Sequence, residues 1–301
     1  ALYGLADVAV VEEDYGRARS ALEELLRSVD DGRTDIEKEH LYLRLGQVLQ
    51  TLGEESRLAV VYFQKATGGP WTVSKPAFEA LEEIHSGEEN WGDVARVLEQ
   101  SLLRSEDDDE RVARLCRLTK IVSERHGDPT RAIELLEAAV SSLPQQRDLL
   151  KPLAALYRHA ADTEKLADTL GRLSELNTDP AVLVDIYLEQ AGLLSTELNQ
   201  VDVAVEAYAK ALGCDPDNLV ALDGLIDITR ERERFGELAA LLERRAALSE
   251  ASEAARLRFE LAQIFARQLK KPEAAIEQLK LAKEGDSRAT HVLRLLGYLY
   301  F

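Results

Sequence analysis

The 301-residue sequence predicts an all-α fold, because strong helix formers dominate its composition and one helical pattern returns about every 36 residues. Leu, Ala, Glu and Arg are abundant, whereas aromatic residues make up only 6% and there are 8 Pro and 17 Gly. Strands would require more β-branched and aromatic residues than this. An apolar fraction of 46% is enough for a substantial core.

Two interleaved sets of similar segments define the repeat. The first set is anchored on alanines that are separated by 73, 72 and 71 residues, and the second on apolar residues separated by 72 and 72. Together they give a step of about 36 residues in which two kinds of unit alternate. The two sets are Ala59, Ala132, Ala204 and Ala275, and Val94, Leu166 and Leu238.

Each step contains two amphipathic helices, as residues 218–248 illustrate. Apolar side chains follow each other there at spacings of three and four residues, first around Leu222 and Leu225 and then around Leu238 and Leu242. Such spacing places them on one face of each helix. Because neither face can be buried alone, the two helices are expected to pack as a hairpin and each hairpin on the next.

Small residues recur at the positions where these helices would cross, with a large apolar or aromatic residue between the last two. In this pattern the sequence resembles the tetratricopeptide repeat family, and long bacterial tandem arrays in particular. The best-matching units contain Ala191, Ala204, Tyr208, Ala211 and Pro216, and Gly46, Ala59, Phe63 and Ala66. Alternate units depart from the pattern with Glu82, Val94 and Ser101, and with Ile226, Leu238 and Arg245.

The resemblance implies a right-handed α-α solenoid of about eight helical hairpins plus one extra terminal helix, forming a single domain over residues 1–301. The expected last helix has an apolar end, at Leu295, Leu296, Leu299 and Phe301, where a solenoid normally carries a polar cap. Since the chain also contains no Met, we expect it to be a fragment of a longer array. The expected units are 1–30, 35–67, 74–104, 108–142, 146–176, 179–213, 217–248 and 250–285, with a partial unit at 287–301.

Turn residues support these boundaries. Residues 215–218, Asp-Pro-Asp-Asn, should end one helix and cap the next, and the prolines of residues 128–129 and 271–272 should begin second helices. Residues 68–74 form the longest stretch without a helical pattern. We therefore predict a loop between two repeats here, with Trp71 in the loop. The alternative is a flexible joint.

No catalytic or cofactor-binding motif is apparent, so we expect no enzyme and no cofactor. The sequence lacks a Gly-rich phosphate loop, a His-Glu-x-x-His pair and a Cys-x-x-Cys pair, and its five histidines fall in five different units. Cys116 and Cys214 lie too many repeats apart for a disulfide. The acidic run 106–110 precedes a helix and is better explained as an N-terminal cap than as a calcium site, because it lacks alternating ligands and a central Gly.

The formal net charge of −18 argues against binding to nucleic acids or to anionic membranes, since both require a basic surface. No uncharged apolar run approaches the roughly 18 residues of a membrane span. A cytoplasmic location fits these observations and the expectation of reduced cysteines.

The resemblance further implies that a partner binds on the concave face, which first helices line. The inward positions of the fourth and fifth units carry cations, and we expect them to contact an acidic segment of a protein or peptide partner. The alternative is the mixed charge of any helix surface. The candidate partner-binding residues are Arg117, Lys120, Lys151, Arg158 and His159, flanked by Glu79 and Glu83 and by Asp223 and Asp227.

Three functions are compatible with this sequence. The first is a protein–protein interaction scaffold. The second is the regulatory segment of a larger enzyme or of a secretion or motility machine. The third is a structural solenoid that assembles end to end through its apolar termini.

Overall fold

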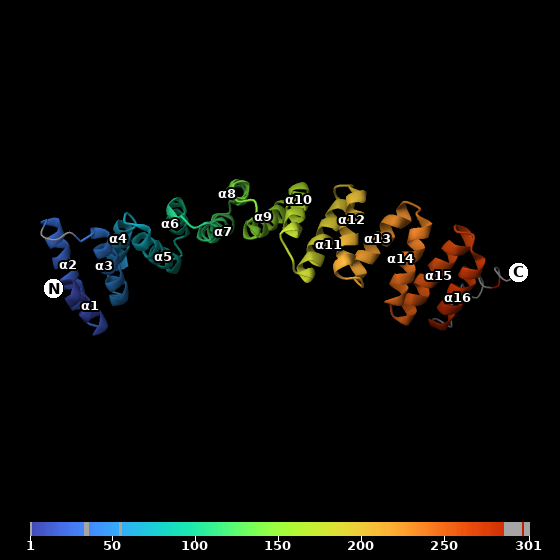
Figure 1. Ribbon diagram of the computed structural model, residues 1–301, viewed down its shortest axis with the longest axis horizontal. Helices are drawn as coiled ribbons and strands as arrows, with labels where there is room; N and C mark the ends of the chain where they lie inside the picture. Colours follow the sequence, from blue (N-terminus) through green and yellow to red (C-terminus); the bar gives the residue numbers. More distant parts are fainter. Residues whose placement is uncertain (1, 33–35, 54–55, 286–296, 298–301) are drawn as a thin grey trace. The chain divides into compact units, whose positions relative to one another are not determined.

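The computed structural model describes residues 2–32, 36–53, 56–285 and 297, and within these ranges it contains sixteen α-helices and no strand (Figure 1). This confirms the all-α class. The expected helix at 287–301 lies almost wholly outside the described residues. The helices are α1 (Leu2–Val11), α2 (Tyr15–Asp30), α3 (Lys38–Leu52), α4 (Ser56–Ala66), α5 (Trp71–Gly87), α6 (Trp91–Arg104), α7 (Asp108–Glu124), α8 (Pro129–Ser142), α9 (Arg147–Ala160), α10 (Thr163–Glu175), α11 (Pro180–Thr196), α12 (Val201–Cys214), α13 (Leu219–Glu231), α14 (Phe235–Ala247), α15 (Ala251–Arg267) and α16 (Pro272–Gly285).

The chain forms two compact units, Ala1–Leu156 and Tyr157–Phe301. In the first unit, α1 to α8 pack in chain order, each helix against the next, and α3 also contacts α5. The small and aromatic residues of the repeat pattern lie where α3 and α4 cross, and Ala59, Phe63 and Ala66 are completely buried there. Small side chains let the two helix backbones approach closely, so that a single large ring fills the space between them.

The second unit follows the same principle. Its helices from α10 to α16 also pack in chain order, and α11 contacts α13 as well as α12. The alanines that the repeat pattern singles out in the hairpins α11–α12 and α15–α16 are completely buried, and Tyr208 is 8% exposed. The alanines are Ala191, Ala204, Ala211, Ala262, Ala275 and Ala282.

Helix caps occur where the turn residues predict them. Asp128 caps α8, which begins at Pro129, by accepting a hydrogen bond from the Arg131 N–H at 3.0 Å. Asn218 caps α13 in the same way. In the acidic run, Asp107 is the N-cap of α7, and its carboxylate accepts a hydrogen bond from the Glu110 N–H at 3.0 Å. This confirms that the run caps a helix.

The expectation of a loop through residue 74 is wrong, because α5 begins at Trp71. The Pro70 carbonyl accepts hydrogen bonds from the N–H groups of Val73 and Ser74, both at 2.9 Å, so Pro70 supplies the first turn of the helix with an acceptor. The Trp71 ring lies 6.4 Å from the ring of Phe78, centroid to centroid. Trp71 therefore belongs to the packed part of α5, and only the residues before it form a loop.

Larger residues replace the small ones at the crossing positions of α5 and α6, and they are buried all the same. Val94 and Ser101 are completely buried, and the Ser101 hydroxyl donates to the Leu98 carbonyl at 2.8 Å. Glu82, the third of these residues, is 7% exposed. A buried carboxylate loses its hydration and requires a positive charge or hydrogen-bond donors nearby. The surroundings of Glu82 therefore form a candidate site.

Candidate functional site

An open groove about 280 Å³ in volume lies between α5 and α7 in the first unit. Both helices are the first helices of their hairpins, and Leu98 of α6 forms part of the groove's lining. Six charged side chains surround it, three acidic and three basic. The residues that line this α5–α7 groove are Lys75, Glu79, Glu82, Leu98, Glu110, Ala113, Arg114 and Arg117.

Three ion pairs cross the groove, and each joins a residue of α5 to a residue of α7 that lies 35 positions later. Lys75 Nζ contacts Glu110 Oε1, and Arg117 Nε contacts Glu82 Oε1. Arg114 Nη2 lies 3.7 Å from Glu79 Oε1. The formal charges of the groove therefore balance, because each cation faces one carboxylate.

Three of these charged groups nevertheless keep a buried atom without a hydrogen-bond partner among the described residues. The atoms are Glu82 Oε1, Glu110 Oε2 and Arg114 Nε. Arg117 lies against Glu82 Oε1, but the contact lacks hydrogen-bond geometry. Unpaired buried polar atoms are costly, and they are rare enough in folded proteins that each one requires an explanation.

The Arg114 guanidinium is held in place from two sides. It lies 5.3 Å from the centroid of the Trp71 ring, and only 11% of its side chain is exposed. Stacking on an aromatic face is favourable for a guanidinium and restricts its orientation. Because the helix begins at Trp71, the first turn of α5 positions one wall of the groove.

Burial raises the pKa of Glu82 above its ordinary value, and the nearby Arg117 and Arg114 guanidiniums lower it by less than burial raises it. Glu79 adds a smaller effect in the same direction as burial. The ionised form of Glu82 is therefore less favourable in the folded protein than in water.

We expect Glu82→Gln to become increasingly more stable than the wild type as the pH rises. A carboxyl whose pKa is raised on folding contributes stability that is present below its unfolded pKa and is lost as the pH rises through its folded pKa. Because Gln resembles the neutral form at every pH, the difference should be near zero at pH 3.5 and should grow from about pH 4 upward. Urea unfolding of both proteins at several pH values measures this difference.

The matched control is Glu134→Gln, which removes an exposed carboxylate of α8 in the same unit. Its stability relative to the wild type should not vary with pH in the same way. A constant difference for Glu82→Gln between pH 3.5 and 7 would contradict the assignment of a raised pKa to this group.

The sequence-predicted cations are distributed over both units. Arg117, Lys120 and Lys151 belong to the first unit, and Arg158 and His159 to the second. All five residues are exposed. Of the five, Arg117 lines the α5–α7 groove.

Three of these cations already have an acidic partner. Arg117 contacts Glu82, and Lys151 Nζ lies 3.5 Å from Asp148 Oδ1. Arg158 donates two hydrogen bonds to Glu189, at 2.7 and 2.8 Å, which raise the pKa of this guanidinium further. An acidic segment would have to compete with these carboxylates for each cation.

Sequence reasoning identified Arg117 and Glu79 but missed the other charges of the groove. A signal for them exists: Lys75, Glu79 and Glu82 have charges opposite to those of Glu110, Arg114 and Arg117, the residues one repeat later. Spacings of three and four residues also place each trio on one helix face. Comparing charges at equivalent repeat positions would have predicted the three pairs.

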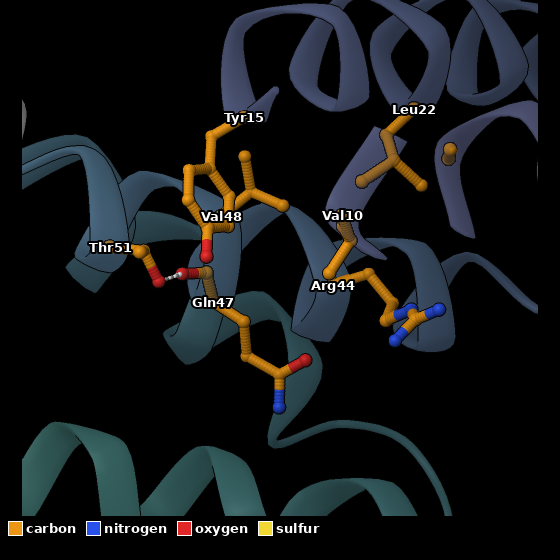
Figure 2. A pocket seen from close by; sticks show the side chains of 8 residues that line it. Val10, Tyr15, Leu22, Arg44, Gln47, Val48 and Thr51 are labelled. Carbon is orange, nitrogen blue, oxygen red and sulfur yellow. Dashed lines mark hydrogen bonds between the residues drawn. The ribbon is translucent and has the colours of Figure 1, made fainter. Parts of the chain in front are cut away.

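In two other hollows of the first unit, the Asp and Arg residues of the lining form ion pairs. The smaller one, about 70 Å³, lies between α1, α2 and α3, where the Thr51 hydroxyl donates to the Gln47 carbonyl at 3.0 Å and the Gln47 carboxamide extends away from Leu22 (Figure 2). Arg44, also on its wall, pairs with Asp7. We therefore do not assign a function to this hollow.

The other hollow, about 270 Å³, is lined by residues of α5 and α6 and by residues at the end of α4. His85 lines it from the last turn of α5, and its side chain is buried. Its Nδ1 atom has no hydrogen-bond partner among the residues described and lies 4.0 Å from Glu88. The charged residues of the walls, Asp93 and Arg96, pair with each other.

The described part of the chain contains neither a metal-binding cluster nor a membrane-spanning helix. There, no group of three or more His, Cys, Asp or Glu side chains could hold a metal ion. None of the helices that the structure describes combines the length and apolar character needed to cross a membrane. Cys116 and Cys214 are free thiols, and burial raises the pKa of Cys116.

Comparison with known proteins identifies the fold. No protein-family model matches the sequence, and no curated protein matches it. Among solved structures, the complex of Naa15/Naa10 bound to HypK-THB contains a chain that matches with a TM-score of 0.51 and 14% identity, over 98% of this chain and 43% of that one. YrrB, described as a TPR protein with an unusual peptide-binding site, matches with a TM-score of 0.41 and 12% identity, over 67% of this chain and 98% of that one. A tetratricopeptide repeat protein from Parabacteroides merdae matches with a TM-score of 0.38 and 18% identity, over 74% of this chain and 99% of that one.

Proposed function

We propose that this chain, whose fold is of the tetratricopeptide repeat type, is a protein–protein interaction scaffold that binds a peptide or a protein segment in the α5–α7 groove. The observation that carries the proposal is the set of buried charged atoms without hydrogen-bond partners at Glu82, Glu110 and Arg114. A polypeptide main chain offers both N–H donors and C=O acceptors, so a bound segment could satisfy the two carboxylate oxygens and the guanidinium N–H together.

The dimensions of the groove support this proposal. The groove has a volume of about 280 Å³ and is open to solvent, as the binding of a peptide segment requires. Apolar contact is available from Leu98 and Ala113. The matched chain of the Naa15/Naa10 complex shares the fold of this chain and belongs to an assembly of proteins.

The exposed cations that the sequence predicts as partner contacts extend this proposal beyond the groove. Arg117 lies within it, and Lys120 and Lys151 are exposed in the same unit, where they could contact a longer partner. In the second unit, Arg158 and His159 would provide a separate contact.

Panning a display library of random dodecapeptides against the chain tests the proposal. Peptides should be enriched, and Ala113→Gln should weaken their binding about tenfold, because the longer side chain occupies the groove without breaking an ion pair. Ala138→Gln places the same side chain on the exposed face of α8 and should leave binding unchanged. If no peptide is enriched, or if Ala113→Gln binds as well as the wild type, the groove is not the binding site.

A further inference from the structure

We propose that the α5–α7 groove selects a basic segment, and that Lys or Arg side chains of the partner lie against Glu82 and against Glu110. This inference rests on the proposed function, and it specifies the chemistry of the partner. It also reverses the sequence-based expectation of an acidic segment.

The unpartnered atoms of the groove favour a ligand rich in donors. Two of the three are carboxylate oxygens, Glu82 Oε1 and Glu110 Oε2, and a carboxylate can only accept hydrogen bonds when it is ionised. An ammonium or guanidinium group carries several N–H donors and a positive charge, so a basic residue at each end of the groove could satisfy one of these oxygens. Glu82 is more than nine-tenths buried, which makes this pairing stronger than it would be on an exposed surface.

The electrostatic environment of Glu82 points in the same direction. Burial dominates the environment of Glu82, even though two guanidiniums are close to it. An added cation would therefore compensate this buried carboxylate.

Each cation of the groove already has a partner. Lys75 and Arg117 each contact a carboxylate of the facing helix, and Arg114 is stacked on Trp71. An acidic ligand would compete with these carboxylates for the cations. A basic ligand would place donors against the carboxylate oxygens that lack a hydrogen bond, Glu82 Oε1 and Glu110 Oε2.

The charge of the whole chain would assist association with such a partner. A net charge of −18 attracts a basic segment over distances comparable to the Debye length, which increases the rate of association at low salt. It would repel an acidic segment to a similar degree.

Sequencing the peptides that the random dodecapeptide library yields tests this inference separately from the proposed function. We expect Lys and Arg to be enriched over the starting library, and binding to weaken as the salt concentration rises. Glu110→Gln and Glu82→Gln each remove a charge at nearly constant volume, and each should weaken binding about tenfold, as the loss of a charged hydrogen bond predicts.

Glu134→Gln is the control, because it removes an exposed carboxylate of α8 in the same unit and should bind like the wild type. Far-UV circular dichroism establishes that each variant is folded. If peptides are enriched but are neutral or acidic, the inference is overturned while the proposed function stands. The same holds if basic peptides bind the two groove variants as tightly as the control. If no peptide is enriched, both are overturned.

Discussion

Replacing Phe63 by alanine should lower the free energy of unfolding by about 3–5 kcal/mol, the largest effect that we expect from a single substitution in this chain. Phe63 lies in the middle of α4, is completely buried and packs in a core cluster with Leu49, Phe78 and Leu81. Its removal takes away apolar contacts and leaves a cavity that helices packed on both sides cannot fill.

Urea unfolding followed by circular dichroism measures this loss, and Val61→Ala is the control. Val61 lies in the same helix but is 41% exposed, so its truncation should cost no more than about 0.5 kcal/mol. Because each hairpin of a repeat protein contacts only its neighbours, hydrogen exchange should accelerate most in α3, α4 and α5. A cost below about 1 kcal/mol for Phe63→Ala would show that the ring does not fill this core.

The place of Phe63 in the core could be predicted from sequence, because it depends on a spacing that returns in every repeat. Helices that cross closely need small residues at the crossing point, so Ala59 and Ala66 identify the ring between them. The same reasoning identified Tyr208 between Ala204 and Ala211. Contacts within one hairpin can be predicted from sequence in this way, because the residues that make them recur at a constant spacing along the chain.

Contacts between hairpins were harder to predict. Gly224 of α13 lies directly against Tyr208 of α12, so that an added Cβ atom would approach ring carbons to 2.7 and 2.8 Å. The repeat pattern identified Ile226 and not Gly224 as the crossing residue of α13. The reason is that the pattern describes how α13 crosses α14 within one hairpin and does not describe how one hairpin packs on the next. The start of α5 was missed for a related reason: the contact of Trp71 with Arg114 of α7 is tertiary, and the Gly-Gly-Pro sequence before Trp71 resembles a longer loop.

The candidate site was predictable only in part. Sequence periodicity placed Arg117 on a first helix and drew attention to its charge, but the charge alone suggested an acidic partner. Its pairing with Glu82 depends on a departure from the small-residue pattern, and only the structure shows how deeply this carboxylate is buried. The preference for a basic partner follows from that burial.

The second large effect concerns Gly46, whose substitution by alanine should destabilise the protein by about 1–3 kcal/mol. Gly46 lies within α3, and a Cβ atom there would approach Phe63 Cε1 and Cδ1 to 2.6 and 2.7 Å. Ring carbons of a completely buried phenylalanine have little room to move away. Alanine in a helix interior normally stabilises by up to about 1 kcal/mol relative to glycine, so a loss of stability would have a steric cause.

Gly192→Ala provides the matched control. Gly192 also lies within a helix, α11, but nothing approaches an added Cβ atom within 4 Å. This substitution should therefore stabilise the protein by up to about 1 kcal/mol, as helix propensity alone predicts. Urea unfolding of the two alanine variants should give changes of opposite sign.

Combining the two substitutions isolates the contact between the residues. In a Phe63→Ala background the ring that collides with the new methyl group is absent, so Gly46→Ala should become stabilising, as Gly192→Ala is. The coupling free energy of this double-mutant cycle should then be about 1–4 kcal/mol in favour of the double variant, because a loss of about 1–3 kcal/mol is replaced by a gain of up to about 1 kcal/mol. Additive effects would mean that Gly46 and Phe63 do not touch, and the close crossing of α3 and α4 would have to be explained by other residues.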